Sequence, residues 1–406
     1  MIIQRAFRTK LILNNKEKNY FYSCAAFARF VYNWGLADRH EMWFAYKSLS
    51  GLCDRVDKNF KNALSGNRFE QSKYFNSIKD KQFPWNREYP YKIVESSFRD
   101  LDDAFNNFFR RVKNGETAGY PKFKNKGSRK SFRLPSVGPI ENDRINLKNR
   151  IGWVRLKEHG YLPTDPSVKI NSATISEHAG EWYVSVQVEM DVEEPAKPQG
   201  ESIGVDLGIK STAVLSNGTV FDPPQPLRKL EKKLSRLQRE LSRRQKFSKN
   251  WYKTKDKISA LHVKISNIRR NHQHDVSSHI VYSTDAKSIA IEDLNVKGMM
   301  RRAKPILNEA GNGYAHNNAK AKSGLSKSLS DAGMGELRRQ IEYKAEWNGA
   351  EIVKADRWYA SSKLCSRCGH KNINLRLTNR VWVCDNCGEV LDRDLNAAKN
   401  LVSLAA

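Results

Sequence analysis

The sequence lacks any long apolar run. Nowhere in its 406 residues does a stretch approach the roughly 20 consecutive apolar residues that a membrane-spanning helix needs. The first residues, Met1-Ile-Ile-Gln-Arg-Ala-Phe-Arg8, contain no apolar core of the kind found in secretory signal peptides. We therefore expect a protein that has no membrane attachment and is not secreted.

Cysteine is also scarce. The chain has six cysteines, and four of them fall in two close pairs within residues 365–387. Cys24 and Cys53 have no partner at metal-ligand spacing, so we expect them to be core or surface thiols. Paired cysteines of this kind suit a metal site in a reducing compartment better than a disulfide framework. We therefore expect the protein to act in a reducing compartment such as the cytoplasm.

Acidic residues are few relative to basic ones. The chain carries 44 Asp and Glu against 71 Lys and Arg, which gives a formal net charge of +27. The basic residues are spread over nearly the whole length and are not gathered in one tail. A surplus of this size favours a polyanionic partner, bound with a strong dependence on salt. The length allows two or more domains, each with its own core.

The first half of the chain combines β-rich and helical segments. Residues 1–13 and 143–192 carry apolar and β-branched residues in patterns typical of strands. Together they predict a small β-barrel into which a helical block, residues 15–130, is inserted. The segment Val192-Glu-Glu-Pro-Ala-Lys-Pro-Gln-Gly200 is a proline-rich linker and predicts a domain boundary.

Two helices stand out in the helical block. One is capped by Asn15 or a neighbour and runs through Leu36, and the other begins at Lys92 and breaks at Asn114-Gly115. Apolar residues of the second helix recur in steps of three and four, which predicts a stripe packed on a neighbouring helix. This stripe consists of Val94, Phe98, Leu101, Phe105, Phe108 and Val112.

Two basic segments have the composition of nucleic-acid surfaces. The loop over 119–133 interleaves lysines and arginines with Tyr120, Phe123 and Phe132, whose rings could stack on bases. Farther on, residues 226–270 predict a helical hairpin with an apolar seam and a basic exterior, which we interpret as a phosphate-contacting arm. The alternatives are a solvated loop and a coiled coil with solvated lysines.

The second half begins with a buried strand, Ile203 to Leu207, that carries Asp206. A strand over 211–216, a type I′ turn at Asn217-Gly218 and a strand over 219–221 complete a predicted meander, as in an RNase H-like core. An ionised carboxylate on an apolar strand is costly unless a cation lies against it. Taken alone, Asp206 fits equally a turn residue at a strand end or half of a buried ion pair.

Three further segments return the chain to this core. Ser288-Ile-Ala-Ile-Glu292-Asp-Leu294 predicts a buried strand that ends in a carboxylate. Residues 298–330 are rich in Asn, Gly, Ala and Lys, and predict a mobile segment. A helix over 331–347 and a strand over 351–354 follow.

The paired cysteines predict a zinc ribbon. Two Cys-x-x-Cys pairs, each followed by glycine, are separated by fifteen residues, and they supply four thiolates for a tetrahedral Zn²⁺. The ligands are Cys365, Cys368, Cys384 and Cys387. Short β elements are expected at 376–378 and 381–383. His370 could compete as a ligand, but four thiolates fill the shell and leave no open position, so we expect this zinc to be structural.

A third carboxylate follows the ribbon. Asp394 lies in Asp392-Arg-Asp-Leu-Asn-Ala-Ala398, at the start of a short amphipathic helix, where an aspartate can also be a mere N-cap. With Asp206 and Glu292 it makes a set of three acids that would repel one another unless divalent cations neutralised them. Two-metal phosphoryl transfer uses such a set, with ions about 3.5–4 Å apart. Carboxylate ligands favour Mg²⁺ or Mn²⁺.

These motifs resemble the TnpB family, transposon-encoded relatives of the type V CRISPR effectors. In the second half the resemblance is carried by Gly204-Val-Asp-Leu-Gly-Ile-Lys210, Ile291-Glu-Asp-Leu-Asn295, the paired cysteines and the segment around Asp394. In the first half it is carried by Ala28-Arg-Phe-Val-Tyr-Asn33, Leu101-Asp-Asp-Ala-Phe-Asn-Asn-Phe-Phe-Arg110 and Gly119-Tyr-Pro-Lys-Phe-Lys124. It therefore covers nearly the whole chain.

The resemblance implies an RNA-guided DNA endonuclease. A guide RNA encoded at the transposon end would pair with one strand of double-stranded target DNA. The protein would read a short motif beside the target, and a RuvC-like site would cut. The family's catalytic, metal-binding carboxylates correspond to Asp206, Glu292 and Asp394, with Asp392 as the near neighbour of the last.

The resemblance also implies an α+β multidomain fold. The expected domains are a β-barrel wedge domain (1–14 and 131–195), a helical recognition domain (15–130), a RuvC-like, RNase H-like α/β nuclease domain with a helical hairpin (200–360 and 389–406) and an inserted Cys₄ zinc ribbon (361–388).

Two other functions fit part of the pattern. A nuclease-inactive, RNA-guided DNA-binding repressor would be favoured by loss of one carboxylate, and all three are present. An unguided RuvC-type resolvase, or a transposase that joins strands, would not need the basic helical block at 15–130. We rank the guided nuclease first.

Overall fold

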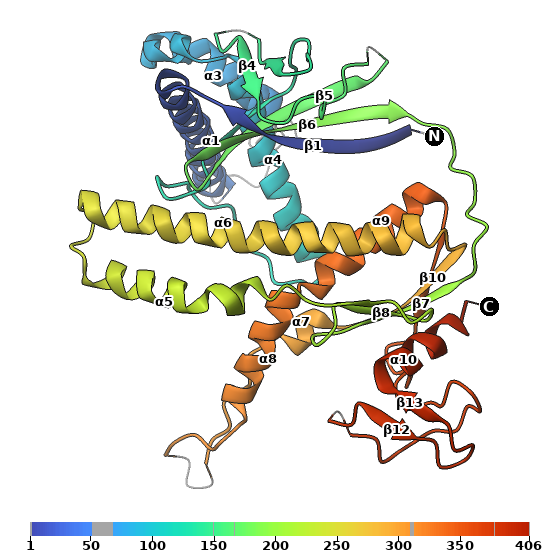
Figure 1. Cartoon of the computed structure of the whole chain (residues 1–406). Coiled ribbons are helices and arrows are strands. Elements are labelled where there is room, and N and C mark those ends of the chain that lie inside the picture. Colours follow the sequence, from blue (N-terminus) through green and yellow to red (C-terminus); the bar gives the residue numbers. More distant parts are fainter. Residues whose placement is uncertain are drawn as a thin grey trace. The chain divides into compact units, whose positions relative to one another are not determined.

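The computed structural model describes residues 2–50, 68–148, 150–165, 167–308, 312–376 and 378–405 (Figure 1). Cys53 lies outside these ranges. The chain forms two compact units, Met1–Glu193 and Glu194–Ala406, and the division between them falls inside the linker expected at 192–200. Of the helices in the described ranges, none has both the length and the apolar character of a membrane span.

A six-stranded antiparallel sheet forms the centre of the first unit, with strand order β2-β5-β6-β1-β4-β3. The strands are β1 (Ile2–Ile12), β2 (Ser131–Leu134), β3 (Arg144–Asn146), β4 (Trp153–Leu156), β5 (Lys169–His178) and β6 (Glu181–Asp191). The long β1 pairs with β6 along most of its length and with β4 at its end. This sheet corresponds to the predicted β-barrel, and among the described strands it is a half barrel, because the edge strands β2 and β3 do not pair.

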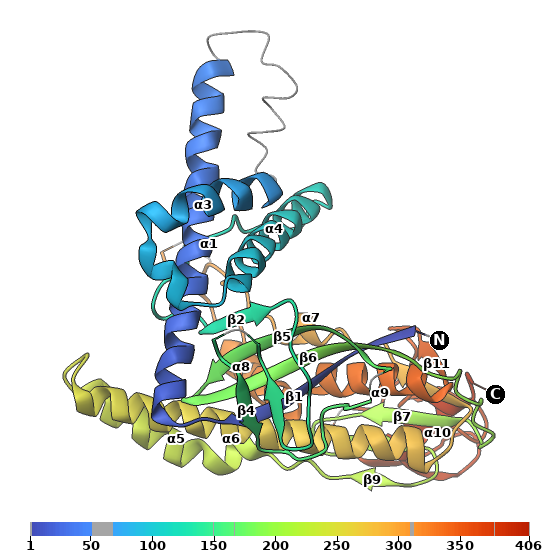
Figure 2. The ribbon, with the colours of Figure 1, turned by 90° about the horizontal axis from the view of Figure 1, so that it is seen from above.

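The helices inserted between β1 and β2 pack on one another (Figure 2). They are α1 (Asn15–Ser50), α3 (Arg68–Gln82) and α4 (Lys92–Lys113), with a 3₁₀ turn, η1 (Pro84–Glu88). A capping box starts α1: the Glu17 amide donates to Asn14 Oδ1 at 2.9 Å, and the Asn14 amide donates to Glu17 Oε2 at 2.7 Å. The cap is therefore Asn14, the residue next to Asn15.

The apolar stripe of α4 packs on a neighbouring helix, as predicted. Leu101 and Phe105 form a buried cluster with Tyr32 and Leu36 of α1. The stripe is buried only in its first part, because Val112 near the end of α4 is exposed.

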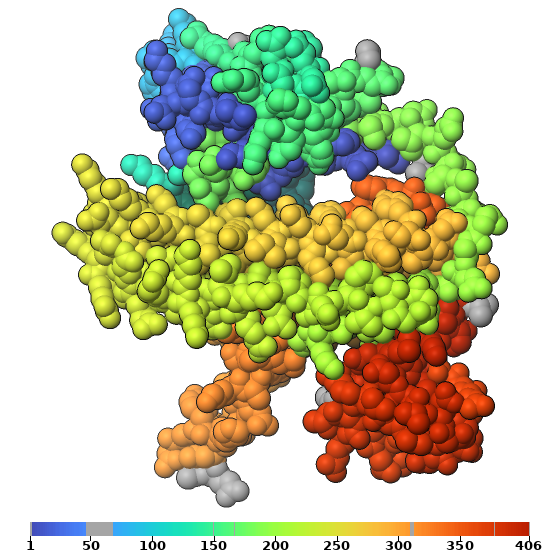
Figure 3. Space-filling model, in the orientation of Figure 1, coloured from blue at the N-terminus to red at the C-terminus, as the bar shows by residue number. Residues whose placement is uncertain are grey.

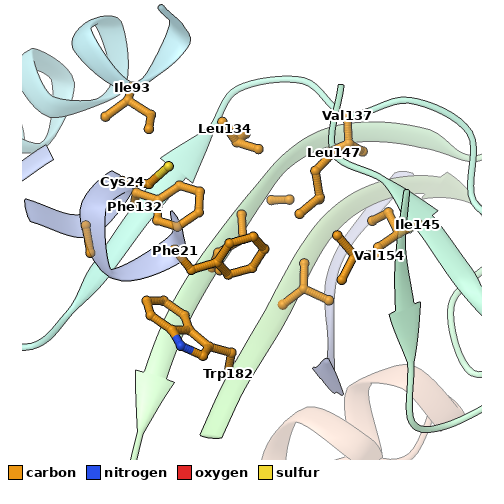
Figure 4. Close-up of a cluster of buried hydrophobic side chains, with 14 of the residues drawn as sticks. Phe21, Cys24, Ile93, Phe132, Leu134, Val137, Ile145, Leu147, Val154 and Trp182 are labelled. Carbon is orange, nitrogen blue, oxygen red and sulfur yellow. The ribbon is translucent and has the colours of Figure 1, made fainter. Parts of the chain in front are cut away.

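The core of this unit lies between the sheet and the inserted helices (Figure 4). Phe21 of α1 meets Phe132 of β2 and Trp182 of β6 edge to face, with ring centroids 5.6 and 5.4 Å apart. Phe132 is only 3% exposed. The prediction that its ring could stack on bases is therefore wrong, since it belongs to the core.

The second unit is built on a five-stranded mixed sheet with order β11-β10-β7-β8-β9 (Figure 1). The strands are β7 (Ile203–Leu207), β8 (Ala213–Leu215), β9 (Val220–Phe221), β10 (Ser288–Glu292) and β11 (Glu351–Ala355). A meander of β7, β8 and β9 continues into β10 and β11, both of which run parallel to β7, as in an RNase H-like core. One face packs on α6 (Lys249–Ser278) and α9 (Met334–Asn348), and the other receives α10 (Arg393–Val402).

The turn between β8 and β9 is longer than predicted. The Gly218 amide donates to the Leu215 carbonyl at 2.9 Å. Gly218 has φ 90°, whereas Asn217 is not at positive φ. A type I′ turn needs positive φ at both central residues, so this loop is a three-residue connection that ends in a left-handed glycine.

A helical hairpin extends from this sheet. Helix α5 (Pro226–Arg243) lies along α6 (Figure 3). The last turn of α6 continues into a short π-helix, η2 (His279–Ser283). The buried seam consists of Leu234, Leu237, Leu261 and Ile265. The predicted hairpin is thus present.

The segment predicted to be mobile, residues 298–330, overlaps two helices, α7 (Val296–Met299) and α8 (Ala319–Ala332). The helix predicted over 331–347 begins instead at Met334, because Gly333 has φ 65° and separates α8 from α9. The Asp331 carboxylate accepts hydrogen bonds from the Leu227 amide at 3.1 Å and the Arg228 amide at 3.3 Å. Asp331 therefore caps the first turn of α5.

The ribbon between β11 and α10 has one small hairpin. Strand β12 (Val381–Val383) pairs with β13 (Val390–Asp392) in antiparallel register. The sequence placed a second β element at 376–378, but Arg376 and Thr378 lie outside the described strands.

Candidate active site and zinc site

The four paired cysteines converge on one point. Their sulfur atoms all lie within 4.8 Å of one another. Cys365 Sγ is 3.7 Å from Cys387 Sγ, and Cys368 Sγ is 3.6 Å from Cys384 Sγ. Sulfurs about 2.3 Å from a central zinc form a tetrahedron with edges of about 3.8 Å, so the cluster has the size of a zinc site. Within the described residues, His370 is not part of this group.

Both Cys-x-x-Cys pairs sit on the same kind of tight turn. The Gly369 amide donates to the Cys365 carbonyl at 2.8 Å, and the Gly388 amide donates to the Cys384 carbonyl at 2.9 Å. The two glycines have φ 73° and 71°, a conformation that residues with a side chain rarely adopt. The repeated turn aims two sulfurs from each pair at the shared centre.

Asp206 and Glu292 lie on neighbouring parallel strands. Val205 of β7 is in register with Ile291 of β10, so Asp206 and Glu292 are the next residues along the two strands. Successive side chains of a strand point to opposite faces of the sheet. Since Val205 and Ile291 pack in the core under α6 and α9, both carboxylates point to the face that receives α10.

Helix α10 packs on this face at Gly204 of β7. A Cβ added to Gly204 would lie 2.0 Å from the Ala398 carbonyl oxygen, so the helix backbone rests directly on β7. Asp394 is four residues before Ala398 and lies on the same side of α10. The helix therefore presents Asp394 to the strand that carries Asp206.

The three carboxylates share one electrostatic environment. Burial raises the pKa of Asp206 to about 7, and the negative charges of Glu292 and Asp394 add to this shift. Arg393 and Arg380 oppose it. A cation beside Asp206 would stabilise its ionised form and so lower its pKa.

Asp394 is held by two arginines. Arg380 Nη1 lies 3.2 Å from Asp394 Oδ2, and Arg393 Nη2 lies 3.0 Å from Asp394 Oδ1. Among the described residues, the three carboxylates do not form a group whose oxygens all lie within 4.8 Å of one another. The neighbouring Asp392 is the N-cap of α10, because its Oδ1 accepts from the amides of Asp394 and Leu395 at 3.0 and 2.9 Å.

A buried polar network joins Glu292 to α10 and the ribbon. Ser361 donates its hydroxyl hydrogen to Glu292 Oε1, and the Ser361 carbonyl accepts from Asn400 Nδ2 at 2.7 Å. Asn400 and Asn396 both donate to the Leu364 carbonyl, next to the first zinc ligand, at 2.7 and 2.6 Å. Sequence reasoning missed these residues. The spacing of the two asparagines, four apart on a short amphipathic helix, was a signal that could have found Asn396 and Asn400.

Two motifs of the first unit also meet. Asn33 Nδ2 donates to the Lys124 carbonyl, and the Lys124 amide donates to Asn33 Oδ1, both at 2.8 Å. Lys124 Nζ lies 3.7 Å from the centre of the Tyr32 ring, and burial lowers the pKa of this lysine. Lys124 therefore turns inward and anchors the basic loop. Tyr120 and Phe123 are 45% and 52% exposed, so both are accessible for stacking.

The helical hairpin predicted over residues 226–270 has a basic surface. An open hollow of about 890 Å³ runs along α5. Its basic lining consists of Lys232, Arg236, Arg239, Arg243 and Arg244. Glu231 and Glu240 are the acids of the same lining, so its cations outnumber its anions. Such a surface attracts a phosphate backbone.

Three family models match parts of this chain. They are described as "Probable transposase" (IS605 OrfB; residues 185–303), "Cas12f1-like, TNB domain" (residues 335–401) and "Helix-turn-helix domain" (residues 1–48). The described part of residues 1–48 forms β1 and one continuous helix, α1. The first two matches cover the sheet of the acidic site, the ribbon and α10.

Curated relatives and one solved structure are similar over most of the chain. "Putative RNA-guided DNA endonuclease InsQ" of Escherichia coli (strain K12) is 36% identical over 321 residues, covering 79% of this chain and 75% of that protein. "Putative RNA-guided DNA endonuclease" of Streptomyces pristinaespiralis is 33% identical over 317 residues, covering 76% and 70%. The fold is similar to that in a cryo-EM structure of a Cas12f1-sgRNA-target DNA complex, with TM-score 0.51, 15% identity and coverage of 96% of this chain and 83% of that one.

Proposed function

Since the chain belongs to the TnpB family of IS605 OrfB proteins, we propose that it is an RNA-guided DNA endonuclease whose active site consists of Asp206, Glu292 and Asp394. The observation that carries this proposal is the packing of α10 on Gly204. It brings an acid from the end of the chain to the sheet face on which Asp206 and Glu292 stand.

The donor set suits hard divalent cations. When bound, a pair of Mg²⁺ or Mn²⁺ ions would activate water and stabilise the leaving oxygen of a phosphodiester. The chain's own residues orient the ligands. Ser361 fixes one oxygen of Glu292, while Arg380 and Arg393 neutralise Asp394 until cations compete for it. The three carboxylates would bind two ions, so their oxygens need not lie as close together as the four cysteine sulfurs that would bind one zinc ion. The Cys₄ zinc is structural and takes no part in the chemistry.

The rest of the chain would hold the nucleic acids. We assign a wedge domain to 1–14 and 131–195, a recognition domain to 15–130, a RuvC-like domain to 200–360 and 389–406, and a zinc ribbon to 361–388. The guide RNA would come from the transposon end, and the target would be double-stranded DNA next to a short motif, in a prokaryotic cytoplasm. The basic hollow along α5 and the loop anchored by Asn33 would contact phosphates and bases.

Purification from cells that carry the whole transposon tests this proposal. The protein should retain one defined RNA, and replacing the guide segment of that RNA should redirect cleavage to DNA of the new complementary sequence. Guided binding without cleavage would instead support the repressor. Cleavage of branched DNA by RNA-free protein would support the unguided resolvase. Either result would overturn the assignment.

A further inference from the structure

An exposed tryptophan lies next to the acidic site. Trp358 is 86% exposed and lies three residues after the end of β11. Ala355, the last residue of β11, is in register with Glu292 on the parallel strand β10. Because parallel strands end at the same edge of a sheet, the loop that carries Trp358 leaves the sheet beside Glu292.

This loop is fastened on both sides of the tryptophan. The Trp358 amide donates to Asp356 Oδ1 at 2.8 Å. Arg357 Nη2 lies 2.9 Å from Asp293 Oδ2, which ties the loop to the residue after Glu292. On the other side, the Tyr359 hydroxyl donates to the Asn400 carbonyl at 3.1 Å. The backbone is thus held while the indole ring remains in solvent.

The ring borders an open hollow lined by residues of both charges. The hollow is open to solvent and has a volume of about 540 Å³. Its lining holds three basic residues, Arg338, Lys354 and Arg357, and two acidic ones, Asp293 and Asp356, beside Trp358. Arg338 Nη1 pairs with Asp293 Oδ1 at 2.8 Å, so one acid holds two guanidinium groups in place. A flat aromatic ring beside fixed cations is the arrangement that binds a single nucleic-acid strand, by base stacking and phosphate contact.

We propose that Trp358 is a stacking platform for one base of single-stranded DNA as the strand enters the acidic site, with Arg357 of the same loop contacting a neighbouring phosphate. This inference rests on the proposed nuclease function, because that function requires a separated strand at Glu292. Trp358 is a positioning residue: it holds the strand so that a phosphodiester next to the stacked base reaches the carboxylates.

Guided cleavage with single abasic sites tests the proposal. Trp358→Ala should slow cleavage about tenfold, since stacking of one base contributes about 1–3 kcal/mol. Trp358→Phe should restore most of the rate. In the wild type, an abasic site at one position near the cut should slow cleavage by a similar factor, and in Trp358→Ala the same site should have no further effect. Ile373→Ala, which removes a comparably exposed apolar side chain of the ribbon, is the matched control and should cleave like the wild type.

A binding measurement tests the inference without relying on cleavage. The RNA-loaded chain is titrated with a labelled thymidine oligonucleotide, and with its counterpart carrying abasic sites, at raised salt that weakens phosphate contacts. The wild type should prefer the oligonucleotide with bases about tenfold, and Trp358→Ala should lose that preference. If the wild type does not cleave, the proposed function fails while this ratio still decides the stacking role. An unchanged ratio, or an abasic profile that is the same in both proteins, would overturn the inference.

Discussion

Gly204 of β7 and Ala398 of α10 touch backbone to backbone: a Cβ on Gly204 would lie 2.0 Å from the Ala398 carbonyl oxygen and 2.7 Å from the Val402 amide nitrogen. No side chain fits between strand and helix at this point. The contact decides how deeply α10 sits on the sheet, and so where Asp394 lies relative to Asp206.

Gly204→Ala should therefore displace α10. Because the contacted atoms are backbone and cannot rotate away, we expect a loss of about 3 kcal/mol in the free energy of unfolding together with a loss of cleavage. Gly324→Ala is the control, since it places the same methyl group in open space on α8 and should stabilise that helix by up to about 1 kcal/mol. Thermal unfolding of both variants checks the pair, and equal effects would mean that the contact is unimportant.

The Asp206 carboxyl should make the metal-free protein sensitive to pH. Its pKa is raised from the ordinary 3.8 to about 7, so the folded state binds this proton more tightly than the unfolded state does. Stability from this group is complete below about pH 4 and is lost as the pH rises to about 7, by an amount on the order of a few kcal/mol. Asp206→Asn should not show that loss, and Mg²⁺ should restore stability at pH 8 in the wild type only. Melting curves at several pH values, with and without Mg²⁺, measure this. Parallel profiles for the two proteins would contradict the assignment.

Removing the Ser361 hydroxyl should loosen Glu292. The hydroxyl donates to Glu292 Oε1, and a hydrogen bond to a charged group contributes about 1.5–3 kcal/mol, so Ser361→Ala should slow cleavage about tenfold or more. It should also raise the Mg²⁺ concentration needed for half-maximal rate, an effect that a general loss of stability does not produce. Ser361→Thr should recover part of the activity. Ser362→Ala is the control, because within the described residues that hydroxyl does not bond to Glu292. An unaltered Mg²⁺ dependence in Ser361→Ala would exclude the positioning role.

The ribbon should depend on zinc for its fold. Cys384→Ser removes one of four converging thiolates, and zinc content and thermal stability should fall together, since metal binding is coupled to folding here. His370→Ala should retain one zinc per chain and the stability of the wild type, because the ring is outside the cluster. Elemental analysis measures the zinc content of the two variants, and unfolding curves measure their stability. A stable, zinc-free Cys384→Ser protein would show that the metal is dispensable.

The sequence could predict the features that depend only on neighbouring residues. Paired cysteines with following glycines define the turns of the ribbon by themselves. Asp206 stands out because it interrupts an apolar strand, and Glu292 because it ends one. Capping by Asn14 and the end of α4 at Asn114 also follow from neighbouring residues.

The rest depends on contacts between distant segments. Which of Asp392 and Asp394 faces the site is decided by the cap of α10, and no feature of the sequence predicts that Ser361 reaches Glu292. The burial of Phe132 could not be predicted, because its strand β2 has only four residues and follows a basic loop. So short a strand does not show from its sequence which of its faces is buried. Asp331 caps α5, which lies about a hundred residues earlier in the chain, and no local pattern predicts that contact.

The most direct test of the central claim is electron paramagnetic resonance of Mn²⁺ in the guide- and target-loaded complex. If Asp206, Glu292 and Asp394 hold two ions together, the wild type should bind two Mn²⁺ with the spectrum of a spin-coupled pair, and Asp206→Asn should lose that coupling while still binding guide and target. Isolated, uncoupled Mn²⁺ signals in a wild-type complex that cleaves its target would contradict the two-metal site.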